Sequence, residues 1–440
     1  MNRILEQFKH GITTDGYRDT EAGVLPSDWE CAKISEIFDP ITQVAGTDQY
    51  ETVSISAGVG FVNQAQKFGK ELSGKQYEKY TVLHRGDFSY NKGNSGKYPQ
   101  GCIYRLKDRE SAAVPNVFES FCIKSGCSDY YDQLFTSGYL NHQLYRLINH
   151  GVRDDGLLNL TQEDFYSCTL PVPPYSEQEK IAEILATQDS VVELCEKNIE
   201  QLKKLKKVFL QKMFPKPGAT IPEWRFPGFT DAWEQRKFAS VFDGLQNNTL
   251  SRAELNYESG TVKNVHYGDV LIKFGDYIDA SETELPYISD DAKADKFKNS
   301  FLQDGDIIIA DTAEDDTVGK CTEIQGSEGL KLLSGLHTIA CRPKEKYGPM
   351  FLGYYINSPA YHNQLKPLMQ GIKVTSISKS AFQDTDMIVP KSIDEQIKIG
   401  EYFANLDNLI TLHQRKCDEE KHRKNALMQL LLTGIVRLKI

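Results

Sequence analysis

The tripeptide Pro173-Pro174-Tyr175 is a stretch whose residue types could do chemistry. In enzymes that methylate the exocyclic amine of adenine, an Asn or Asp stands before such a pair of prolines. Its side-chain oxygen accepts a hydrogen bond from the target amine, while the aromatic ring stacks on the flipped base. Val172 occupies that position here and offers no acceptor. We therefore interpret this stretch as a connector into a helix and not as a catalytic loop.

Other patterns that indicate catalysis are equally thin. Residues 93–99 lack the Gly-x4-Gly-Lys-Ser/Thr spacing of a phosphate-binding loop, and Asp291-Ala292-Lys293 is too short a match to a nuclease site. The nine cysteines are scattered singly, and no close pair of histidines occurs. These spacings predict no metal site, no disulfide framework and no cofactor bound by this chain.

The bulk composition is ordinary for a globular protein, with 40% hydrophobic and 25% charged residues. No apolar run approaches the ~18–20 residues that a membrane span requires. The N-terminus lacks the apolar core of an export signal. Together with the dispersed cysteines, these features predict a cytoplasmic protein. Its length of 440 residues predicts two to four structural units.

The chain contains an internal repeat. Val-Pro followed by Glu-Gln-x-Lys-Ile occurs at 172–181 and again at 389–399. The other markers that recur in the same order are Trp-Glu (29–30 and 233–234), Gly-Asp (86–87 and 305–306), Leu/Ile-Thr/Ser-x3-Phe (160–165 and 377–382) and Gly-x-basic (151–153 and 371–373). Agreement of so many markers in one order indicates a duplication.

Each Val-Pro connector leads into a long helix. Ser176 and Glu179 fit a capping box, and no Gly or Pro follows before Pro215. The first helix should have about 37 residues and a length of roughly 55 Å. The second should run from a cap at Asp394 to about Thr433. Helices this long would bury their apolar seams by pairing, although each could instead pack on its own domain.

The regions between the helices, roughly 20–170 and 225–388, contain short β-rich runs separated by Gly, Asn and Pro turns. We expect an α+β fold with two mixed α/β domains in tandem, separated by two long helices that pair as an antiparallel coiled coil with pseudo-twofold internal repeat. The expected boundaries are an N-terminal extension (1–24), a first domain (25–172), a first helix (173–215), a second domain (225–389) and a second helix (390–440).

Two globular domains, each followed by Val-Pro, Glu-Gln-x-Lys-Ile and a long helix, resemble the specificity subunit of type I restriction-modification systems. The resemblance covers nearly the whole chain and is strongest at 170–214 and 387–433 and at the two Trp-Glu pairs. The polar middle of the second helix departs from a tight coiled coil.

The resemblance implies a non-catalytic protein with two target-recognition domains, each recognising one half of a bipartite sequence in double-stranded DNA. The paired helices would space the domains and dock two methyltransferase subunits. Those partners would carry S-adenosylmethionine and the complete Asn-Pro-Pro-Tyr/Phe motif, and separate restriction subunits would cleave the DNA. Helices of roughly 55 Å exceed one DNA turn of ~34 Å, so a gap of unread base pairs should separate the two half-sites.

The DNA-contacting residues should lie in basic loops, because a net charge of −10 leaves only local patches for phosphate contacts. Residues 67–109 carry ten Lys and Arg against four Asp and Glu, and residues 346–383 carry four Lys and no acid. Asn can pair with adenine and Lys can donate to guanine. The candidates are Asn91, Lys92, Asn94, Lys97, Tyr98 and Arg153 in the first domain and Lys320, Lys373, Thr375 and Ser376 in the second, followed by His337 and Arg342.

Two other functions remain open at this point. The chain could be a self-contained adenine DNA methyltransferase with fused recognition domains, but no cofactor-binding Phe-x-Gly-x-Gly loop follows a predicted strand. It could also be a coiled-coil scaffold that binds only protein, which its acidic net charge would suit.

Overall fold

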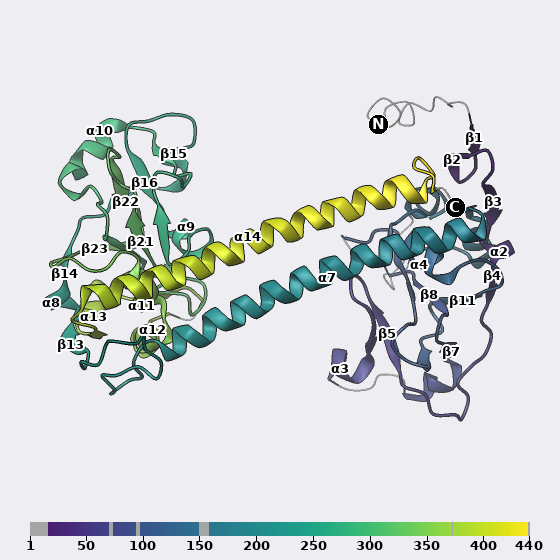
Figure 1. The fold of residues 1–440 in the computed structure, drawn as a ribbon, viewed down its shortest axis with the longest axis horizontal. Helices are drawn as coiled ribbons and strands as arrows, with labels where there is room; N and C mark the ends of the chain where they lie inside the picture. Colours follow the sequence, from purple (N-terminus) through teal and green to yellow (C-terminus); the bar gives the residue numbers. More distant parts are fainter. Residues whose placement is uncertain (1–15, 70–73, 94–96, 149–157, 372, 439–440) are drawn as a thin grey trace. The chain divides into compact units, whose positions relative to one another are not determined.

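The computed structural model describes residues 16–69, 74–93, 97–148, 158–371 and 373–438 (Figure 1). The chain divides into two compact units. Unit 1 consists of residues 1–195 and 416–440, and unit 2 consists of residues 196–415. Each unit contains one domain of strands and short helices, together with part of each of two long helices.

The domain of unit 1 is built from antiparallel strands. Its main sheet has the order β4-β11-β8-β9, and the remaining strands pair as β7 with β10, β5 with β6, β1 with β2, and β3 with β12. The elements are β1 (Tyr17–Thr20), β2 (Gly23–Pro26), β3 (Glu30–Lys33), α2 (Ile34–Ile37), β4 (Phe38–Pro40), β5 (Val53–Ser56), β6 (Gly60–Asn63), α3 (Gln64–Phe68), the 3₁₀ helix η1 (Gly74–Lys79), β7 (Thr81–His84), β8 (Phe88–Asn91), β9 (Cys102–Arg105), β10 (Ser111–Val114), β11 (Glu119–Ile123), α4 (Ser128–Thr136), α5 (Asn141–Leu147), α6 (Gln162–Ser167) and β12 (Thr169–Val172).

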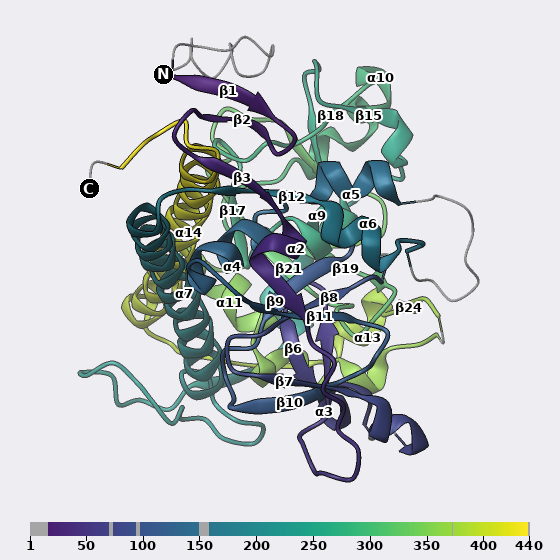
Figure 2. The same ribbon diagram turned by 90° about the vertical axis from the view of Figure 1, so that its right-hand side faces the viewer.

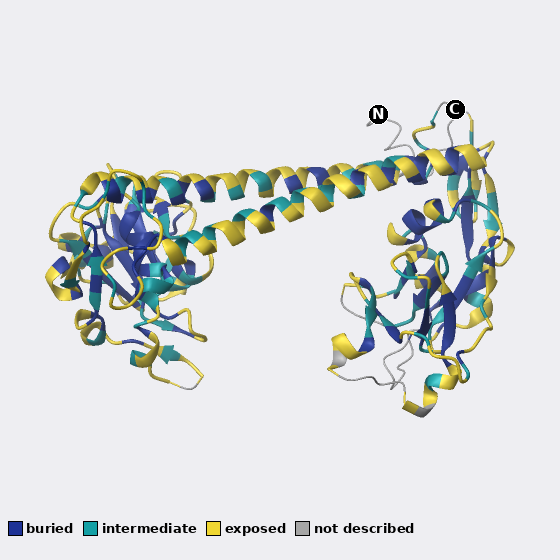
Figure 3. Ribbon diagram, turned by 60° about the horizontal axis from the view of Figure 1, so that its bottom comes forward, coloured by how far each residue is buried: buried dark blue, intermediate teal, exposed yellow. Residues whose placement is uncertain are grey.

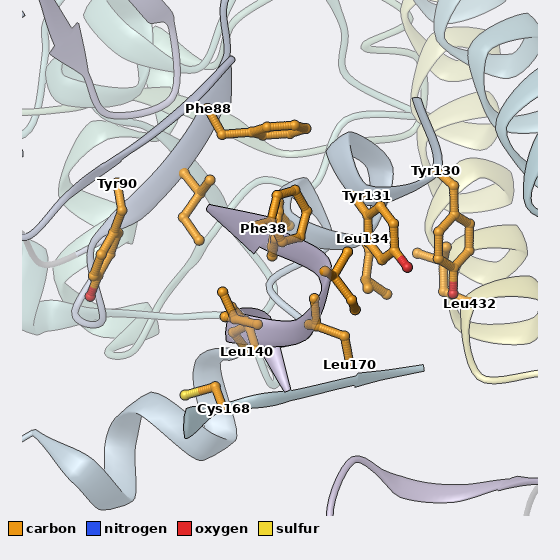
Figure 4. Packing of buried hydrophobic residues seen from close by; sticks show 14 of the residues in the cluster. Phe38, Phe88, Tyr90, Tyr130, Tyr131, Leu134, Leu140, Cys168, Leu170 and Leu432 are labelled. Atoms are coloured by element: carbon orange, nitrogen blue, oxygen red, sulfur yellow. The ribbon is translucent and has the colours of Figure 1, made fainter. Parts of the chain in front are cut away.

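Aromatic side chains fill the core of unit 1 (Figure 4). Phe88 and Phe121 come from neighbouring strands and stack with their ring centroids 5.6 Å apart. Phe38 packs edge-to-face with both rings, with centroid distances of 5.5 and 5.1 Å. The same core includes Leu431 and Leu432 from the last helix of the chain. The first domain is therefore completed by the C-terminal end of the sequence.

The domain of unit 2 contains a mixed sheet. Five strands have the order β14-β23-β19-β21-β17, four have the order β15-β18-β16-β22, and β13 pairs with β25 and β20 with β24. The elements are β13 (Glu234–Lys237), α8 (Phe238–Val241), β14 (Phe242–Gly244), η2 (Arg252–Glu254), β15 (Leu255–Asn256), β16 (Lys263–Val265), α9 (Tyr267–Ile272), β17 (Tyr277–Asp279), β18 (Tyr287–Ile288), α10 (Asp291–Ala294), η3 (Asp295–Ser300), β19 (Ile307–Ala310), β20 (Thr312–Ala313), β21 (Cys321–Gln325), β22 (Leu332–Ser334), β23 (Thr338–Pro343), α11 (Phe351–Asn357), α12 (Pro359–His362), η4 (Lys366–Leu368), β24 (Thr375–Ser376), α13 (Lys379–Gln383) and β25 (Asp386–Val389).

The sequence repeat is also a structural repeat. In unit 1, β3 begins at the glutamate of the Trp-Glu pair and pairs with β12, the strand before the first connector (Figure 2). In unit 2, β13 and β25 form the same antiparallel pair before the second connector. Thr161 caps α6 and Ser378 caps α13 with their hydroxyl oxygens. The expected α+β fold with two tandem domains is confirmed.

Two long helices follow these strand pairs, α7 (Tyr175–Lys212) with 38 residues and α14 (Ile393–Leu432) with 40. Buried and exposed positions alternate along both (Figure 3). Both predicted caps are wrong by two residues. Ser176 lies inside α7, because the Pro174 carbonyl accepts the first helical amides, and Ser392, not Asp394, caps α14 by accepting the Glu395 amide at 3.3 Å. Among the described residues, no helix has the length and apolar character needed to span a membrane.

Candidate functional site

The glutamate of the second Glu-Gln-x-Lys-Ile motif anchors α14 to its domain. Glu395 is buried, and its carboxylate accepts two hydrogen bonds from the Arg225 guanidinium, at 2.6 and 2.8 Å. The indole of Trp233, from the repeated Trp-Glu segment, donates to the same carboxylate at 3.4 Å. The hydrogen bond to Glu395 raises the pKa of Arg225 despite burial. Trp233 and Glu395, which come from two different repeated motifs, therefore meet at the buried ion pair between Glu395 and Arg225.

The glutamate of the first motif makes the equivalent contacts in unit 1. Glu177 is buried and accepts from the Trp29 indole at 3.0 Å and from Arg437 at 2.9 Å. Arg437 also pairs with Asp28 and lies over the Trp29 ring, 5.6 Å from its centroid. In unit 2 the arginine is Arg225, which lies in the linker after α7. In unit 1 it is Arg437, which lies in the tail after α14. Each junction is thus closed by a segment that is remote in sequence.

The glutamine of each motif holds the backbone at the same junction. Gln178 accepts from the amide of Cys127 and donates to the carbonyl of Pro173, both at 2.8 Å. Gln396 accepts from the amide of Gly348 and donates to the carbonyl of Pro390, also at 2.8 Å. The Val-Pro connector and the Glu-Gln pair therefore form one device that fixes the start of a long helix against its domain.

The two long helices pair in antiparallel fashion. In unit 1, Glu177 near the start of α7 meets Arg437 beyond the end of α14, while Gln188, further along α7, donates to Glu420 at 2.8 Å. The first half of α7 therefore runs against the last part of α14. Gln188 and Glu420 are both buried, so part of the polar middle of α14 lies inside the interface.

Equivalent ion pairs bind the helices in the two units. In unit 1, Lys424 pairs with Asp189. In unit 2, Lys206 lies 2.7 Å from Asp407 and 2.8 Å from Asp276. Burial opposes the charge on Lys206, but the two carboxylates outweigh it and raise the lysine pKa. At the sequence level, Asp189 corresponds to Asp407 and Lys424 to Lys206, so the pairs are reciprocal.

Tyr175, the aromatic residue of the Pro-Pro-Tyr stretch, is the first residue of α7 and is exposed. Val172 closes β12 in the strand pair with Glu30. The stretch is a strand-to-helix connector, as the sequence predicts.

The first-domain candidates that the structure describes lie at and after the end of β8. Asn91 accepts from the Gly93 amide at 2.8 Å and so shapes the turn. Lys92 is largely buried, donates to the Leu160 carbonyl at 3.4 Å and lies 3.8 Å from Glu119. Asn94 and Arg153 lie outside the described residues.

Lys97 and Tyr98 come after Lys92 in the sequence, and Lys97 is more exposed to solvent than Lys92. Lys97 is exposed, with its ammonium 5.8 Å from the centroid of the Tyr98 ring. Both residues line a cavity of about 230 Å³ together with Gln100 and Asn141. These amides at the cavity were missed from the sequence, because Asn141 belongs to α5 and nothing local links it to the loop.

In the second domain, the structure brings three of the four candidates together. Lys373 is exposed and lies two residues before β24, the strand formed by Thr375 and Ser376. β24 pairs with β20, and Ser376 also exchanges backbone hydrogen bonds with Gln370. Backbone hydrogen bonds therefore hold the described residues at both ends of this segment, Gln370 on one side and Thr375 and Ser376 on the other.

Lys320 stands apart from that group. Its ammonium donates to the carbonyls of Leu271 and Phe274, each at 2.9 Å, at the end of α9. Burial lowers its pKa. Lys320 thus caps a helix inside the domain.

His337 and Arg342 also have partners within unit 2. Arg342 binds Asp306 through two nitrogens, at 2.8 and 2.7 Å, and His337 lies 3.5 Å from Asp311. Within the described residues, no group of His, Cys, Asp and Glu side chains could hold a metal ion.

Each half of the internal repeat matches the same family of known proteins. The family model for the type I restriction modification DNA specificity domain matches twice, at residues 26–204 and 230–420. The MjaVIII type I restriction enzyme specificity subunit of Methanocaldococcus jannaschii is 24% identical over 64% of this chain and 66% of its own length. A second chain of that organism, named provisionally as the MjaX specificity subunit, is 22% identical over 99% of both.

The fold also matches a solved structure from a study of complex assembly and conformational transition of the type I restriction-modification system. The match has a TM-score of 0.56 and 18% identity and covers 94% of this chain and 99% of the other. At this identity the likeness shows a shared fold.

Proposed function

Because the chain belongs to the type I restriction-modification DNA specificity family, we propose that it recognises a two-part sequence in double-stranded DNA, one part with each domain. The chain is the specificity component of such a system and not a catalytic one. The observation that carries the proposal is the repeat. Each matched segment contains most of a domain, a connector and most of a long helix. Each unit also has the same Trp-Glu-Arg junction.

The paired helices serve as the platform for two methyltransferase subunits in this proposal. Those subunits bind S-adenosylmethionine and transfer the methyl group to adenine, and restriction subunits cleave unmodified DNA. The work takes place in the cytoplasm, where the DNA is. The equivalence of the two junctions supports two copies of one partner, since each repeat fixes its helix to its domain in the same way.

We assign DNA contact first to the exposed candidates and to Tyr98. The exposure of Lys97 in unit 1 and of Lys373 and Ser376 in unit 2 supports this choice, and Tyr98 is half-buried beside Lys97. Lys92 already donates to the Leu160 carbonyl, and Lys320 donates to carbonyls at the end of α9. In this proposal both lysines have a supporting role inside their domains. Asn91 and Thr375 do the same from the strand ends.

The test measures DNA binding by the chain assembled with its cognate methyltransferase subunits, as a function of salt. Lys97→Ala and Lys373→Ala should each weaken binding and lower the salt slope by about 1 if the lysine contacts phosphate. If it donates to a base, discrimination at one half-site should fall by about 1–3 kcal/mol. Lys180→Ala is the matched control, because Lys180 is an exposed lysine of α7 paired with Glu183. If neither Lys97→Ala nor Lys373→Ala changes DNA binding, these loops are not part of the DNA interface.

Two outcomes would favour the other functions. Methyl transfer to DNA by the isolated chain would make it a self-contained methyltransferase. Failure of the assembled complex to prefer any sequence over random DNA would make it a protein scaffold.

A further inference from the structure

The main sheet of unit 2 has one strand more than the main sheet of unit 1. In unit 1 the strand order is β4-β11-β8-β9, so β9 is the edge strand of the described sheet. In unit 2 the order is β14-β23-β19-β21-β17, and β17 pairs with β21 in parallel. An uncovered edge offers backbone N–H and C=O groups with which a further strand can pair.

Backbone hydrogen bonds show that β9 and β21 are equivalent strands. Leu106, the residue after β9, donates its amide to and accepts an amide from the first Gly-Asp pair (86–87), both at 2.8 Å. Ile324 of β21 makes the same two bonds with the second Gly-Asp pair (305–306), at 2.9 and 2.8 Å. The edges of β9 and β21 can therefore be compared residue by residue.

The contacts of unit 2 show what the edge of β21 binds. Glu323, the residue before Ile324, donates its amide to the carbonyl of Asp276, just before β17, at 3.0 Å. The Asp276 side chain accepts hydrogen bonds from Lys206 and Asn357, both at 2.8 Å. In unit 2 an extended segment with a carboxylate thus covers the edge and pairs with a lysine of α7.

In unit 1 a cavity of about 410 Å³ lies beside the edge of β9. It is lined by Gln133 from α4, by Arg105, the counterpart of Glu323, and by Lys424, the counterpart of Lys206. Gln133 is 7% exposed, and its Oε1 atom is buried without a hydrogen-bond partner, as is the Nε atom of Arg105. One acceptor and one donor at the cavity are therefore unsatisfied, and a peptide segment carries both complementary groups.

The charges at the cavity leave a place for one more carboxylate. Three of the four carboxylates that line it, those of Asp108, Asp132 and Asp189, already have a lysine or arginine partner. Within the described residues, Lys424 pairs with one carboxylate, whereas Lys206 in unit 2 pairs with two.

We propose that the edge of β9 binds an extended segment of a partner protein, which adds a strand parallel to β9 and places an Asp or Glu side chain against Lys424. This is strand addition, in which backbone hydrogen bonds bind the segment and side-chain contacts select it. The amide of Arg105 donates to the segment as the Glu323 amide donates to Asp276. The site belongs to unit 1 alone, because β17 already covers the equivalent edge in unit 2. It is independent of DNA recognition.

The probe is a labelled peptide with blocked ends and the sequence of residues 274–280, which contain β17, titrated into the full chain. It should bind, and hydrogen exchange should slow at residues 102–105. A peptide with Asn in place of Asp276 should bind about tenfold more weakly, because a hydrogen bond between charged groups is lost. Lys424→Met should weaken the Asp peptide as much and the Asn peptide little.

Lys180→Met is the matched control, because Lys180 is an exposed α7 lysine of unit 1 that does not line the cavity. It should leave the affinity for the Asp peptide unchanged, and thermal unfolding should show that both variants are folded. If Lys424→Met does not fold, the comparison of the two peptides on the wild-type chain still decides.

Three results would overturn the proposal. The first is equal affinity for the two peptides, or no binding of either. The second is protection from exchange that leaves out residues 102–105. The third is tighter peptide binding after removal of residues 1–15, which would assign the edge to a segment of this chain instead of a partner.

Discussion

Replacing Arg225 by methionine tests the role of the buried junction in unit 2. The Glu395 carboxylate is 1% exposed and the Arg225 side chain is 12% exposed, so little solvent screens the pair. The change removes two hydrogen bonds of 2.6 and 2.8 Å and leaves only the longer bond from Trp233 at 3.4 Å. Breaking a buried ion pair from one side costs about 3–5 kcal/mol, because a charge stays buried without its partner.

The corresponding change in unit 1, Arg437→Met, should cost less. The Arg437 side chain is 34% exposed, so water screens it more. Glu177 also keeps a short bond from the Trp29 indole at 3.0 Å and one from the Leu438 amide at 3.3 Å. We expect a loss of about 1–2 kcal/mol.

The assay is urea unfolding followed by tryptophan fluorescence, with hydrogen exchange to assign the loss to one unit. Arg225→Met should speed exchange at the start of α14 and leave unit 1 protected. The double variant Arg225→Met/Glu395→Gln should regain part of the loss, because the unpaired charge is gone. A cost below about 1 kcal/mol for Arg225→Met, or equal costs at the two junctions, would refute the reasoning from burial.

Three further predictions follow from other contacts. Lys206→Met should destabilise unit 2 by about 1–3 kcal/mol in urea unfolding, since Asp276 and Asp407 would then face each other without a cation; a neutral effect would contradict this. Burial raises the pKa of Glu323 from its ordinary 4.5 to about 7. Between pH 4.5 and about 7 the folded chain therefore holds a proton that the unfolded chain has lost. The free energy of unfolding should fall by about 3 kcal/mol as the pH rises through this range. Glu323→Gln should flatten this pH profile, and an unchanged slope would exclude Glu323 as its source. Insertion of four residues into both long helices, about 6 Å of helix, should lengthen the unread gap of the methylated DNA motif by about two base pairs, which methylome sequencing would detect or exclude.

The repeat and its helices could be predicted from the sequence because their signals are local. The Glu-Gln-x-Lys-Ile motif and the uninterrupted stretch to Pro215 lie within one run of residues. The helix starts differ from the predicted ones because other groups accept the first helical amides. The Pro174 carbonyl does so in place of Ser176, and the Ser392 hydroxyl does so in place of Asp394. Such competition is decided by backbone geometry, which the sequence does not display.

The roles of individual lysines and arginines could not be predicted in the same way. Arg225 meets Glu395 across 170 residues and Arg437 meets Glu177 across 260. The position of Lys320 predicts a loop lysine, but the carbonyls that hold it come from Leu271 in α9 and from Phe274 just after α9, 49 and 46 residues away. Contacts of this kind depend on which segments the fold brings together, so charge and loop position alone do not separate a structural lysine from a DNA-binding one.

The central claim is that each domain specifies one half of a DNA target on which separate subunits act. Methylome sequencing of cells that carry the chain with its methyltransferase subunit tests it most directly, with the wild type compared against a variant whose loop 97–101 is replaced by a Gly-Ser loop. We expect adenine methylation at a motif with two separated halves and, in the variant, lost or relaxed recognition of one half only. A continuous motif, or simultaneous loss of selectivity at both halves, would contradict it.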